Sequence, residues 1–382
     1  MAEKTTKKNA AAKTKPGRRG KTASTAPKAA PAPAPVVFDP GAPALIGSGI
    51  YGIAADAGAS LVHLIPVPYE ATTSYRGGTS KGPAAILEAS YQVDLYDIDT
   101  GRPYEAGIHL QPESKEIRKL NVAAKKAAKI VIQAAMSGKR PKGHDAALAT
   151  VNRASARVNA IVRAAADVAL DDQKIVGVVG GDHSTPYGLI EALALRHPGM
   201  GILHIDAHHD LRAAYEGFEW SHASIMHNVM TRLPSVGKLV QVGIRDFSED
   251  EAKFMKASGG RIITAYDRDI AARRLDGRPF GETARDIAQA LPEEVYISFD
   301  IDGLDPRYCP HTGTPVPGGL EIHEAYRILA EVVRSGRRIV GFDLNEVSPG
   351  ADEWDANVGA RLLYKLIGFT LQSREKSPGV TV

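Results

Sequence analysis

The sequence predicts an α/β protein, in which a single domain holds one doubly wound parallel sheet between two layers of helices. Two observations carry this prediction. From about residue 45, short apolar runs of strand length alternate with longer helical stretches, which is the pattern of βα units. No linker-like stretch divides residues 45–372, so these units are expected to build one domain. The expected architecture therefore has three layers, α/β/α.

Six apolar runs are expected to form the strands of this sheet. Each is about as long as a strand in a globular protein and ends in polar residues. The runs span residues 60–66, 174–179, 201–206, 238–242, 295–299 and 338–344. Between residues 120 and 170 the chain is rich in Ala and is interrupted by SGKRPKGHD, which predicts two helices joined by a turn.

The composition excludes several classes of protein. With 382 residues and 43% hydrophobic content, the chain is large enough to bury a substantial core. No apolar run approaches the roughly 20 residues of a membrane helix, and the N-terminus lacks the apolar segment of a secretory signal. The single cysteine, Cys309, cannot form an intramolecular disulfide, which fits a reducing compartment. We therefore expect a cytoplasmic protein without a membrane partner.

Residues 1–43 are expected to be a disordered basic tail, and residues 44–382 are expected to form the folded domain. Residues 1–37 carry nine Lys or Arg against Glu3 alone, whereas the whole chain has a net charge of only +3. The folded part is therefore mildly acidic and does not have the charge of a nucleic-acid-binding domain. Two roles stay open for the tail: weak electrostatic contact with nucleic acid or an anionic surface, and a purely solubilising one.

Four motifs place acidic and imidazole side chains where predicted strands end. They are GGDHS at 180–184, DAHHD at 206–210, FDIDGLDP at 299–306 and NEVSP at 345–349. In an open parallel sheet, ligands bind outside the carboxyl ends of the strands. The four motifs are therefore expected to meet at one edge of the sheet.

The spacing of the carboxylates within these motifs indicates metal binding. Asp206, His208 and Asp210 alternate along the chain, so an extended backbone would place all three on one face. Asp300 and Asp302 follow the same rule. Because neighbouring carboxylates repel one another and are costly to bury unpaired, cations are needed to neutralise them. Oxygen and imidazole ligands without thiolate suit Mn²⁺, Ni²⁺, Co²⁺, Fe²⁺ or Zn²⁺.

GGDHS, DAHHD and SFDIDGLDP, in this order, resemble the three-part signature of the ureohydrolase family, which includes arginases and agmatinases. The resemblance covers roughly residues 60–370 and includes PVPYEATTSYRGGTSKGPAAI at 66–86 and TGTPVPGGL at 312–320. It implies an arginase-like three-layer fold, a catalytic domain at 44–382 and hydrolysis of a guanidinium C–N bond. The implied substrate is a small cationic guanidino compound.

The resemblance also implies two divalent metal ions per chain, Ni²⁺ or Mn²⁺, which would activate a shared water for attack on the guanidinium carbon. Carried over position by position, one ion would be held by His183, Asp206, Asp210 and Asp300, and the other by Asp206, His208, Asp300 and Asp302. Asp206 and Asp300 would bridge the two ions. Every ligand position of the family is occupied in this chain.

Two further residues are expected to be catalytic. His222, in WSHAS, matches the family's proton-shuttle histidine, which would protonate the departing amine. Glu346, in NEVSP, matches the glutamate that binds the guanidinium nitrogens. The other histidines considered for the shuttle are His204, expected in the core, His209, expected to point away from the ligands, and His227, expected in the core or at the surface.

The substrate is the least determined part of the resemblance. Leu211 and Arg212 follow DAHHD where arginases carry an Asn for the amino acid head group, which disfavours arginine. Tyr215, Phe218 and Trp220 suggest a closed apolar pocket, although packing is the alternative role for such aromatic residues. ATTSYRGGTSKGPAAILEASYQVDLYD, EGFEWSHASIM and DEWDANVGARLLYKL resemble the nickel-dependent guanidine hydrolase branch, which converts free guanidine to urea and ammonia. Agmatinase, guanidinobutyrase and hydrolase of substituted guanidines or biguanides are the alternatives.

The family also sets expectations about partners. A homo-oligomer is expected, trimeric or hexameric as is usual for ureohydrolases, and an accessory protein for metal loading is a possible partner. Two alternatives from other classes are a non-catalytic subunit of a hetero-oligomer and a deacetylase that uses one metal ion. The complete ligand set, together with His222 and Glu346, argues against the non-catalytic subunit.

Overall fold

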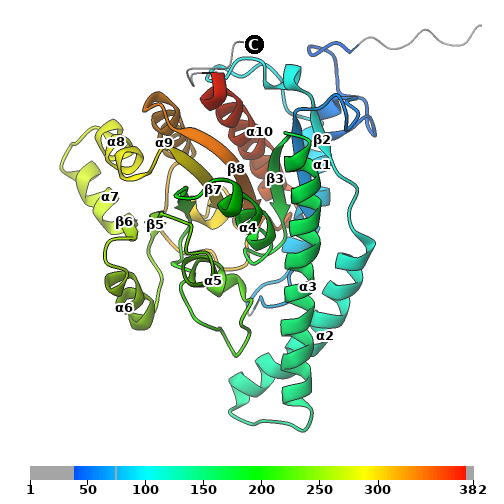
Figure 1. Ribbon diagram of the computed structural model, residues 1–382, viewed down its shortest axis with the longest axis vertical. Helices are drawn as coiled ribbons and strands as arrows, with labels where there is room; N and C mark the ends of the chain where they lie inside the picture. The colour runs from blue at the N-terminus through cyan, green and yellow to red at the C-terminus, as the bar shows by residue number, and fades with distance from the viewer. Residues whose placement is uncertain (1–37, 74, 376–382) are drawn as a thin grey trace, which may run out of the picture. The chain divides into compact units, whose positions relative to one another are not determined.

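The structure is a computed structural model that describes residues 38–73 and 75–375 (Figure 1). The predicted tail at 1–43 lies outside the described residues except for 38–43, which contain a turn but no helix or strand and are largely exposed. None of the helices in the described ranges is both long and apolar enough to cross a membrane. The described ranges contain the complete parallel sheet that the apolar runs predict.

The sheet has eight strands, and every neighbouring pair is parallel. The strands are β1 (Val62–Val67), β2 (Ile108–Leu110), β3 (Ile175–Gly180), β4 (Gly201–Ile205), β5 (Lys238–Ile244), β6 (Ile262–Tyr266), β7 (Glu294–Asp300) and β8 (Arg338–Asn345). Their order is β2-β1-β3-β8-β7-β4-β5-β6. All six predicted strands are confirmed. The two that the sequence missed, β2 and β6, lie at the edges of the sheet, where a strand needs no long apolar run.

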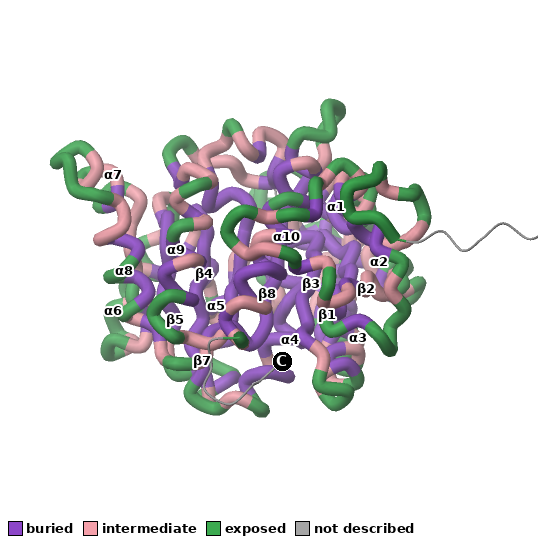
Figure 2. Tube along the Cα trace, turned by 90° about the horizontal axis from the view of Figure 1, so that it is seen from above, coloured by how far each residue is buried: buried purple, intermediate pink, exposed green. Residues whose placement is uncertain are grey.

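Ten α-helices occupy the described part of the chain. They are α1 (Gly82–Ser90), α2 (Lys115–Ser137), α3 (His144–Asp171), α4 (Tyr187–Arg196), α5 (Ile225–Arg232), α6 (Glu249–Ala257), α7 (Asp267–Leu275), α8 (Phe280–Ala290), α9 (Ile322–Arg334) and α10 (Trp354–Glu375). Seen from above, the buried strands lie between helices whose outer surfaces are exposed (Figure 2). The three-layer α/β/α arrangement is confirmed.

The two faces of the sheet pack into separate apolar cores. One core joins the sheet to α1, α8, α9 and α10, and the other joins it to α2, α3, α4 and α5. Along β3, Ile175 and Val179 belong to the first core, whereas Val176 and Val178 belong to the second. This alternation follows from the two-residue period of a strand. Because both faces are covered, the central strands are apolar throughout.

Helices α2 and α3 form the long antiparallel pair that the Ala-rich region predicts, and they extend well beyond the sheet in Figure 1. Gly138, with φ of 64°, ends α2 in the left-handed conformation that glycine adopts readily. Helix α2 also anchors the loop after β1. Lys125 forms an ion pair with Glu70, and the Asn121 side chain accepts a hydrogen bond from the Glu70 backbone nitrogen at 3.0 Å. The helical pair therefore helps to position the loop that leads toward the strand ends.

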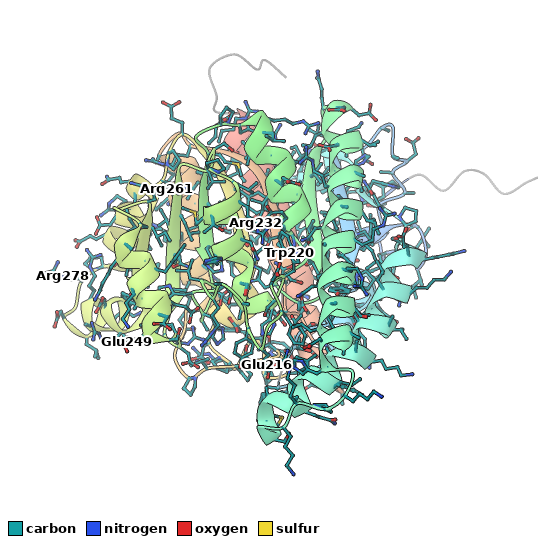
Figure 3. All side chains as sticks on the ribbon, turned by 60° about the horizontal axis from the view of Figure 1, so that its bottom comes forward. Glu216, Trp220, Arg232, Glu249, Arg261 and Arg278 are labelled. Carbon is teal, nitrogen blue, oxygen red and sulfur yellow. The ribbon has the colours of Figure 1, made fainter. Side chains whose placement is uncertain are left out.

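The aromatic segment after DAHHD does not form the closed pocket suggested by its composition. Tyr215 and Phe218 flank a tight turn whose central residues, Glu216 and Gly217, both have positive φ. Phe218 is fully buried in the core shared with α2 to α5. Trp220 lies beneath the guanidinium of Arg232 at 4.6 Å (Figure 3). Phe218 and Trp220 are therefore packing residues, because the turn directs them toward the helix layer.

Gly177 provides a test of how tightly the centre of the sheet is packed. A Cβ at this position would lie 2.4 Å from Cε2 of Phe342 and 3.0 Å from Cδ2 of Leu64. We expect Gly177→Ala to lower the free energy of unfolding by about 1 to 3 kcal/mol, as overpacked core substitutions do. Urea denaturation measures the change. Phe342→Leu in the same chain should recover part of the loss, whereas strictly additive losses would contradict this packing.

Candidate metal centre

The four motifs lie together because their strands are neighbours in the sheet. The order β3-β8-β7-β4 brings GGDHS, NEVSP, FDIDGLDP and DAHHD to adjacent carboxyl ends. Asp206 directly follows β4, and Asp300 is the last residue of β7. His183 lies three residues beyond β3, and Glu346 directly follows β8. The predicted meeting of these residues at one edge of the sheet is present in the structure.

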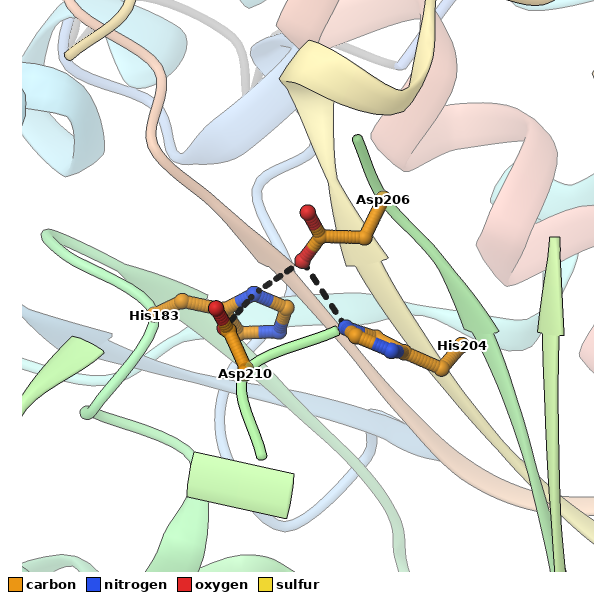
Figure 4. Close-up of side chains that lie close together, drawn as sticks. All are labelled: His183, His204, Asp206 and Asp210. Carbon is orange, nitrogen blue, oxygen red and sulfur yellow. Dashed lines mark hydrogen bonds and ion pairs between the residues drawn. The ribbon is translucent and has the colours of Figure 1, made fainter. Parts of the chain in front are cut away.

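His183 is surrounded by three carboxylates. Its Nδ1 atom lies 3.0 Å from Oδ2 of Asp206, 3.2 Å from Oδ2 of Asp300 and 3.5 Å from Oδ2 of Asp210. Figure 4 shows the His183 ring between Asp206 and Asp210. These four side chains are nearly or fully buried. One nitrogen and three oxygens thus converge on a space where a cation would be held.

A second convergence lies on the other side of Asp206. Nδ1 of His208 is 3.4 Å from Oδ1 of Asp206 and 3.2 Å from Oδ2 of Asp302. Asp206 therefore directs one oxygen toward His183 and the other toward His208. A carboxylate in this position is suited to bridge two cations.

The local backbone is not extended in the way that the alternating motifs suggest. Asp210 has φ of 54°, so the chain turns before it continues past DAHHD. Asp302 lies in the short 3₁₀ helix η5 (Ile301–Gly303), and its backbone nitrogen donates to Oδ1 of Asp300 at 2.8 Å. The expectation of one extended face is therefore wrong at both motifs. Turns after the strands, not strand alternation, bring the carboxylates together.

The sequence did not anticipate the contact of His204 with the carboxylate cluster. Nε2 of His204 lies 2.8 Å from Oδ2 of Asp206 (Figure 4). Gln241 determines which ring nitrogen carries the proton: its amide nitrogen donates both to the His209 carbonyl and to Nδ1 of His204, each at 2.9 Å. Nε2 of His204 therefore donates to Asp206. His204 orients the carboxylate through this bond, as the residues behind a metal ligand commonly do.

His183 is oriented by a chain of two further residues. Its Nε2 atom donates to Oγ of Ser298 at 2.8 Å, and Ser298 donates to Oδ1 of Asp343 at 3.0 Å. This leaves Nδ1 facing the three carboxylates. A metal-binding histidine almost always donates its other N–H group in this way. The sequence signal was an acidic residue, Asp343, inside an otherwise apolar strand.

The protonation of the cluster reflects crowded negative charge. Burial raises the pKa of Asp300 well above its usual value, and the nearby Asp302 and Asp206 raise it further. Burial and Asp206 do the same to the pKa of Asp210. Burial lowers the pKa of His183, but its contacts with Asp206 and Asp300 outweigh this and hold that pKa well above normal. A bound cation would supply the positive charge that the carboxylates otherwise take from protons.

Glu346 has an unsatisfied oxygen in the same cavity. Its Oε1 atom accepts a hydrogen bond from the His183 backbone nitrogen at 3.0 Å. Its Oε2 atom is buried and has no hydrogen-bond partner among the described residues. The backbone of Glu346 has φ of 60°, a conformation that L-residues rarely adopt and that is often found at functional sites. A cation with N–H donors would satisfy this oxygen.

His222 also lines the cavity. It begins the 3₁₀ helix η4 (His222–Ser224), and its Nδ1 atom lies 3.0 Å from Oγ1 of Thr72. Burial lowers the pKa of His222 to about 4, with a smaller effect from His208, so its imidazole is neutral near pH 7. His209 points away and bonds Gln241 at 2.6 Å, while His227 packs against Phe254.

The cavity itself has a volume of about 160 Å³. The predicted site residues that line it are His183, His208, Asp210, His222, Asp300 and Glu346. Asp206 and Asp302 lie behind them, within the two His and Asp groups already described. The structure thus brings all eight predicted site residues to one place.

Comparisons with known proteins agree with this arrangement. The model of the arginase family matches residues 60–368. The N(1)-aminopropylagmatine ureohydrolase of Thermus thermophilus is 32% identical over 310 residues, which cover 81% of this chain and 89% of that protein. The chain belongs to the arginase family. It is therefore a hydrolase that cleaves a C–N bond of a guanidino group.

Other relatives of the chain carry different names. The guanidinobutyrase of Pseudomonas aeruginosa is 28% identical, covering 79% of this chain and 84% of that protein. Among solved structures, the arginase of Medicago truncatula is 25% identical with a TM-score of 0.59, covering 82% of this chain and 88% of that one. The agmatine ureohydrolase of Thermoplasma volcanium, 23% identical, has a TM-score of 0.63 and covers 86% of this chain and 96% of that one. The arginase-like fold is thereby confirmed.

The bond from His183 to Ser298 can be tested through metal affinity. Ser298→Ala removes the acceptor that orients the ring, and we expect metal affinity to fall by about 10-fold to 100-fold. Competition with a chelator, followed by metal analysis of the protein, measures this. Ser60→Ala, which removes another buried hydroxyl at the start of β1, should leave affinity unchanged. Equal affinity in both variants would mean that Ser298 does not support the metal centre.

Proposed function

We propose that this arginase-family hydrolase acts on free guanidine and releases urea and ammonia. The observation that carries the proposal is the unpartnered, buried Oε2 atom of Glu346, which lines a small cavity beside the His and Asp cluster. A guanidinium ion offers planar N–H donors and a positive charge, and both suit this oxygen. The substrate carbon would then lie next to the cluster.

We propose that the cluster holds two divalent cations, Ni²⁺ or Mn²⁺. The proposed ligands are His183, Asp206, His208, Asp210, Asp300 and Asp302, with Asp206 and Asp300 shared between the ions. Oxygen and imidazole donors without thiolate fit both metals. When bound, the two cations supply Lewis-acid activation of a water at neutral pH. Because their ligands must be unprotonated, metal binding should release the proton now shared by His183 and its carboxylates.

Glu346 would hold the guanidinium in the orientation for attack. Its Oε1 atom already accepts one hydrogen bond from the His183 backbone and has a second lone pair, whereas Oε2 is free. The carboxylate therefore has room to accept two N–H groups from one substrate. This pairing supplies charge and orientation together.

His222 would move the proton. Its Nδ1 atom is engaged with Thr72, which leaves Nε2 for the substrate. As a neutral imidazole, it would accept a proton from the attacking water and then donate it to the departing amine nitrogen. This transfer allows ammonia to leave, because an unprotonated amide ion is a very poor leaving group.

The size of the cavity favours guanidine over longer substrates. About 160 Å³ is smaller than the roughly 300 to 1,000 Å³ of typical sites for drug-sized ligands. Agmatine and aminopropylagmatine are the second candidates, because relatives bear the names agmatinase and N(1)-aminopropylagmatine ureohydrolase. Guanidinobutyrate is supported in the same way.

Some expectations stay predictions. These are the boundary of the catalytic domain at residue 44, the disorder of the tail, the trimer or hexamer, the accessory protein for metal loading and the cytoplasmic location. The described residues support the domain assignment only in that the sheet and its helices lie between residues 62 and 375.

Urea release tests the proposed substrate. Protein loaded separately with Ni²⁺ and with Mn²⁺ is offered guanidine, agmatine, 4-guanidinobutyrate and arginine. We expect the highest kcat/KM for guanidine, because the cavity is small. A higher kcat/KM for agmatine with either metal would replace guanidine by the second candidate. Absence of urea from all four would overturn the proposed activity.

His222→Ala tests the proton transfer. Because His222 is not among the proposed metal ligands, the variant should keep its metal while kcat falls by at least about 100-fold, the usual contribution of general acid–base catalysis. Metal analysis and urea release at saturating guanidine measure the two effects. Added imidazole should restore part of the activity. Unchanged turnover would assign the transfer to another group.

A further inference from the structure

Two cavities meet at one pair of side chains. The reactive cavity and a second cavity of about 340 Å³ share Arg212 and Glu251 in their walls. The second cavity is otherwise lined by residues that the proposed reaction does not use, among them His227, Asp250 and Phe254. A substrate that is longer than guanidine could extend from the first cavity only by passing this pair or by leaving toward solvent.

Arg212 spans the boundary between the cavities. Its Nε atom lies 3.5 Å from Oε2 of Glu251, and its guanidinium carbon lies 5.1 Å from the centre of the Tyr215 ring. Tyr215 in turn makes an edge contact with His222, with ring centres 6.0 Å apart. The Arg212 backbone nitrogen donates to the Ala223 carbonyl at 3.1 Å. The Arg212 side chain is thus held by Glu251 and by the Tyr215 ring, and Tyr215 links it to His222.

Glu251 keeps its position without Arg212. Its Oε1 atom accepts from the Leu211 backbone nitrogen at 3.1 Å, and its Oε2 atom accepts from the backbone nitrogen and the hydroxyl of Ser248 at 2.8 Å each. The bond from the Ser248 backbone nitrogen belongs to the capping box at the start of α6, together with the bond from the Glu251 backbone nitrogen to Oγ of Ser248. The carboxylate would therefore remain fixed and accessible if the Arg212 side chain were removed.

The second cavity has the chemistry of an ammonium site once Arg212 is absent. Glu251 supplies negative charge, and Nδ1 of His227 is buried with no hydrogen-bond partner in the described part of the chain. An alkylammonium group could thus pair with Glu251 and donate to His227. With Arg212 present, its positive charge repels such a group.

We propose that Arg212 is a specificity-determining residue that closes the passage between the two cavities. It keeps the ammonium-bearing alkyl tail of a longer guanidine out of the second cavity, both by its volume and by its charge. Substitution of Arg212 by a small residue joins the cavities and exposes Glu251 to the ammonium tail. The inference rests on the proposed function, because it assigns the substrate class of the same site.

The test compares agmatine with guanidine on metal-loaded protein. We expect Arg212→Ala to raise the ratio of kcat/KM for agmatine to that for guanidine by at least about tenfold, or about 1.4 kcal/mol. Arg212→Lys, which keeps the positive charge, should raise the ratio less. Adding Glu251→Gln to Arg212→Ala should remove most of the gain, because the ammonium group loses its charged partner. Calorimetric titration with agmatine should rank the affinities of these variants in the same order as their kcat/KM ratios.

Arg232→Ala is the matched control. Arg232 also lies over an aromatic ring, that of Trp220, and its Nε atom donates to Oδ1 of Asn228 at 2.9 Å (Figure 3). It is not among the residues that line either cavity. The control should leave the agmatine to guanidine ratio unchanged. A shift in the control equal to that in Arg212→Ala would overturn the inference, because the effect would then come from the helix layer.

The possible outcomes distinguish a failure of the inferred closing role of Arg212, called the gate below, from a failure of the proposed function. If wild-type protein prefers guanidine and the Arg212→Ala ratio does not change, the gate is wrong and the proposed function stands. If wild-type protein prefers agmatine, the proposed substrate fails. In that case an agmatine to guanidine ratio that is unchanged or lower in Arg212→Ala overturns the gate as well, whereas a higher ratio supports it. If Arg212→Ala does not fold, Arg212→Gln provides the same comparison, and agmatine binding no tighter than in wild-type protein overturns the gate.

Discussion

The electrostatic repulsion among buried carboxylates is the constraint on which the rest of this structure depends. Asp206, Asp210, Asp300, Asp302 and Glu346 are all nearly inaccessible to solvent and meet at one edge of the sheet. Several negative charges cannot share so small and dry a space unless cations or protons balance them. This concentration of negative charge explains the raised pKa values in the cluster. It also explains why metal ions and a cationic substrate are proposed there. The fold supplies the geometry in which this charge is tolerated.

Hydrogen bonds from side chains behind the cluster hold its carboxylates and His183 in place. His204 and Gln241 support Asp206, while Ser298 and Asp343 support His183. These groups lie inside the strands, where both faces are covered and side-chain rotation is restricted. The residues with unusual backbone angles, such as Asp210 and Glu346, lie just beyond the strands. Asp210 and Glu346, which line the cavity, thus carry backbone strain, while the packed strands keep these positions in register.

The residues proposed for the reaction and those proposed for selectivity lie in different parts of the chain. The carboxylates that are proposed to hold the metals lie at or just after strand ends, whereas Arg212 and Tyr215 lie in the loop after β4 and Glu251 lies in the first turn of α6. Loops tolerate change better than the sheet that supports them. Relatives named for agmatine, aminopropylagmatine and guanidinobutyrate hydrolysis share the family with this chain.

The sequence by itself determined the central strands, the α2 and α3 pair and the set of motifs at the strand ends, because burial on both faces requires apolar runs and because the motifs are local. It did not determine the edge strands β2 and β6, whose partial exposure removes that requirement. Nor did it determine that Phe218 and Trp220 pack into the helix layer, that His204 bonds Asp206, or that Asp210 leaves the extended conformation. The contact of Arg212 with Glu251, 39 positions along the chain, was decided only by the tertiary structure. The sequence shows the spacing of residues along one strand. Which residues on different strands and loops become partners depends on the order of the strands in the sheet.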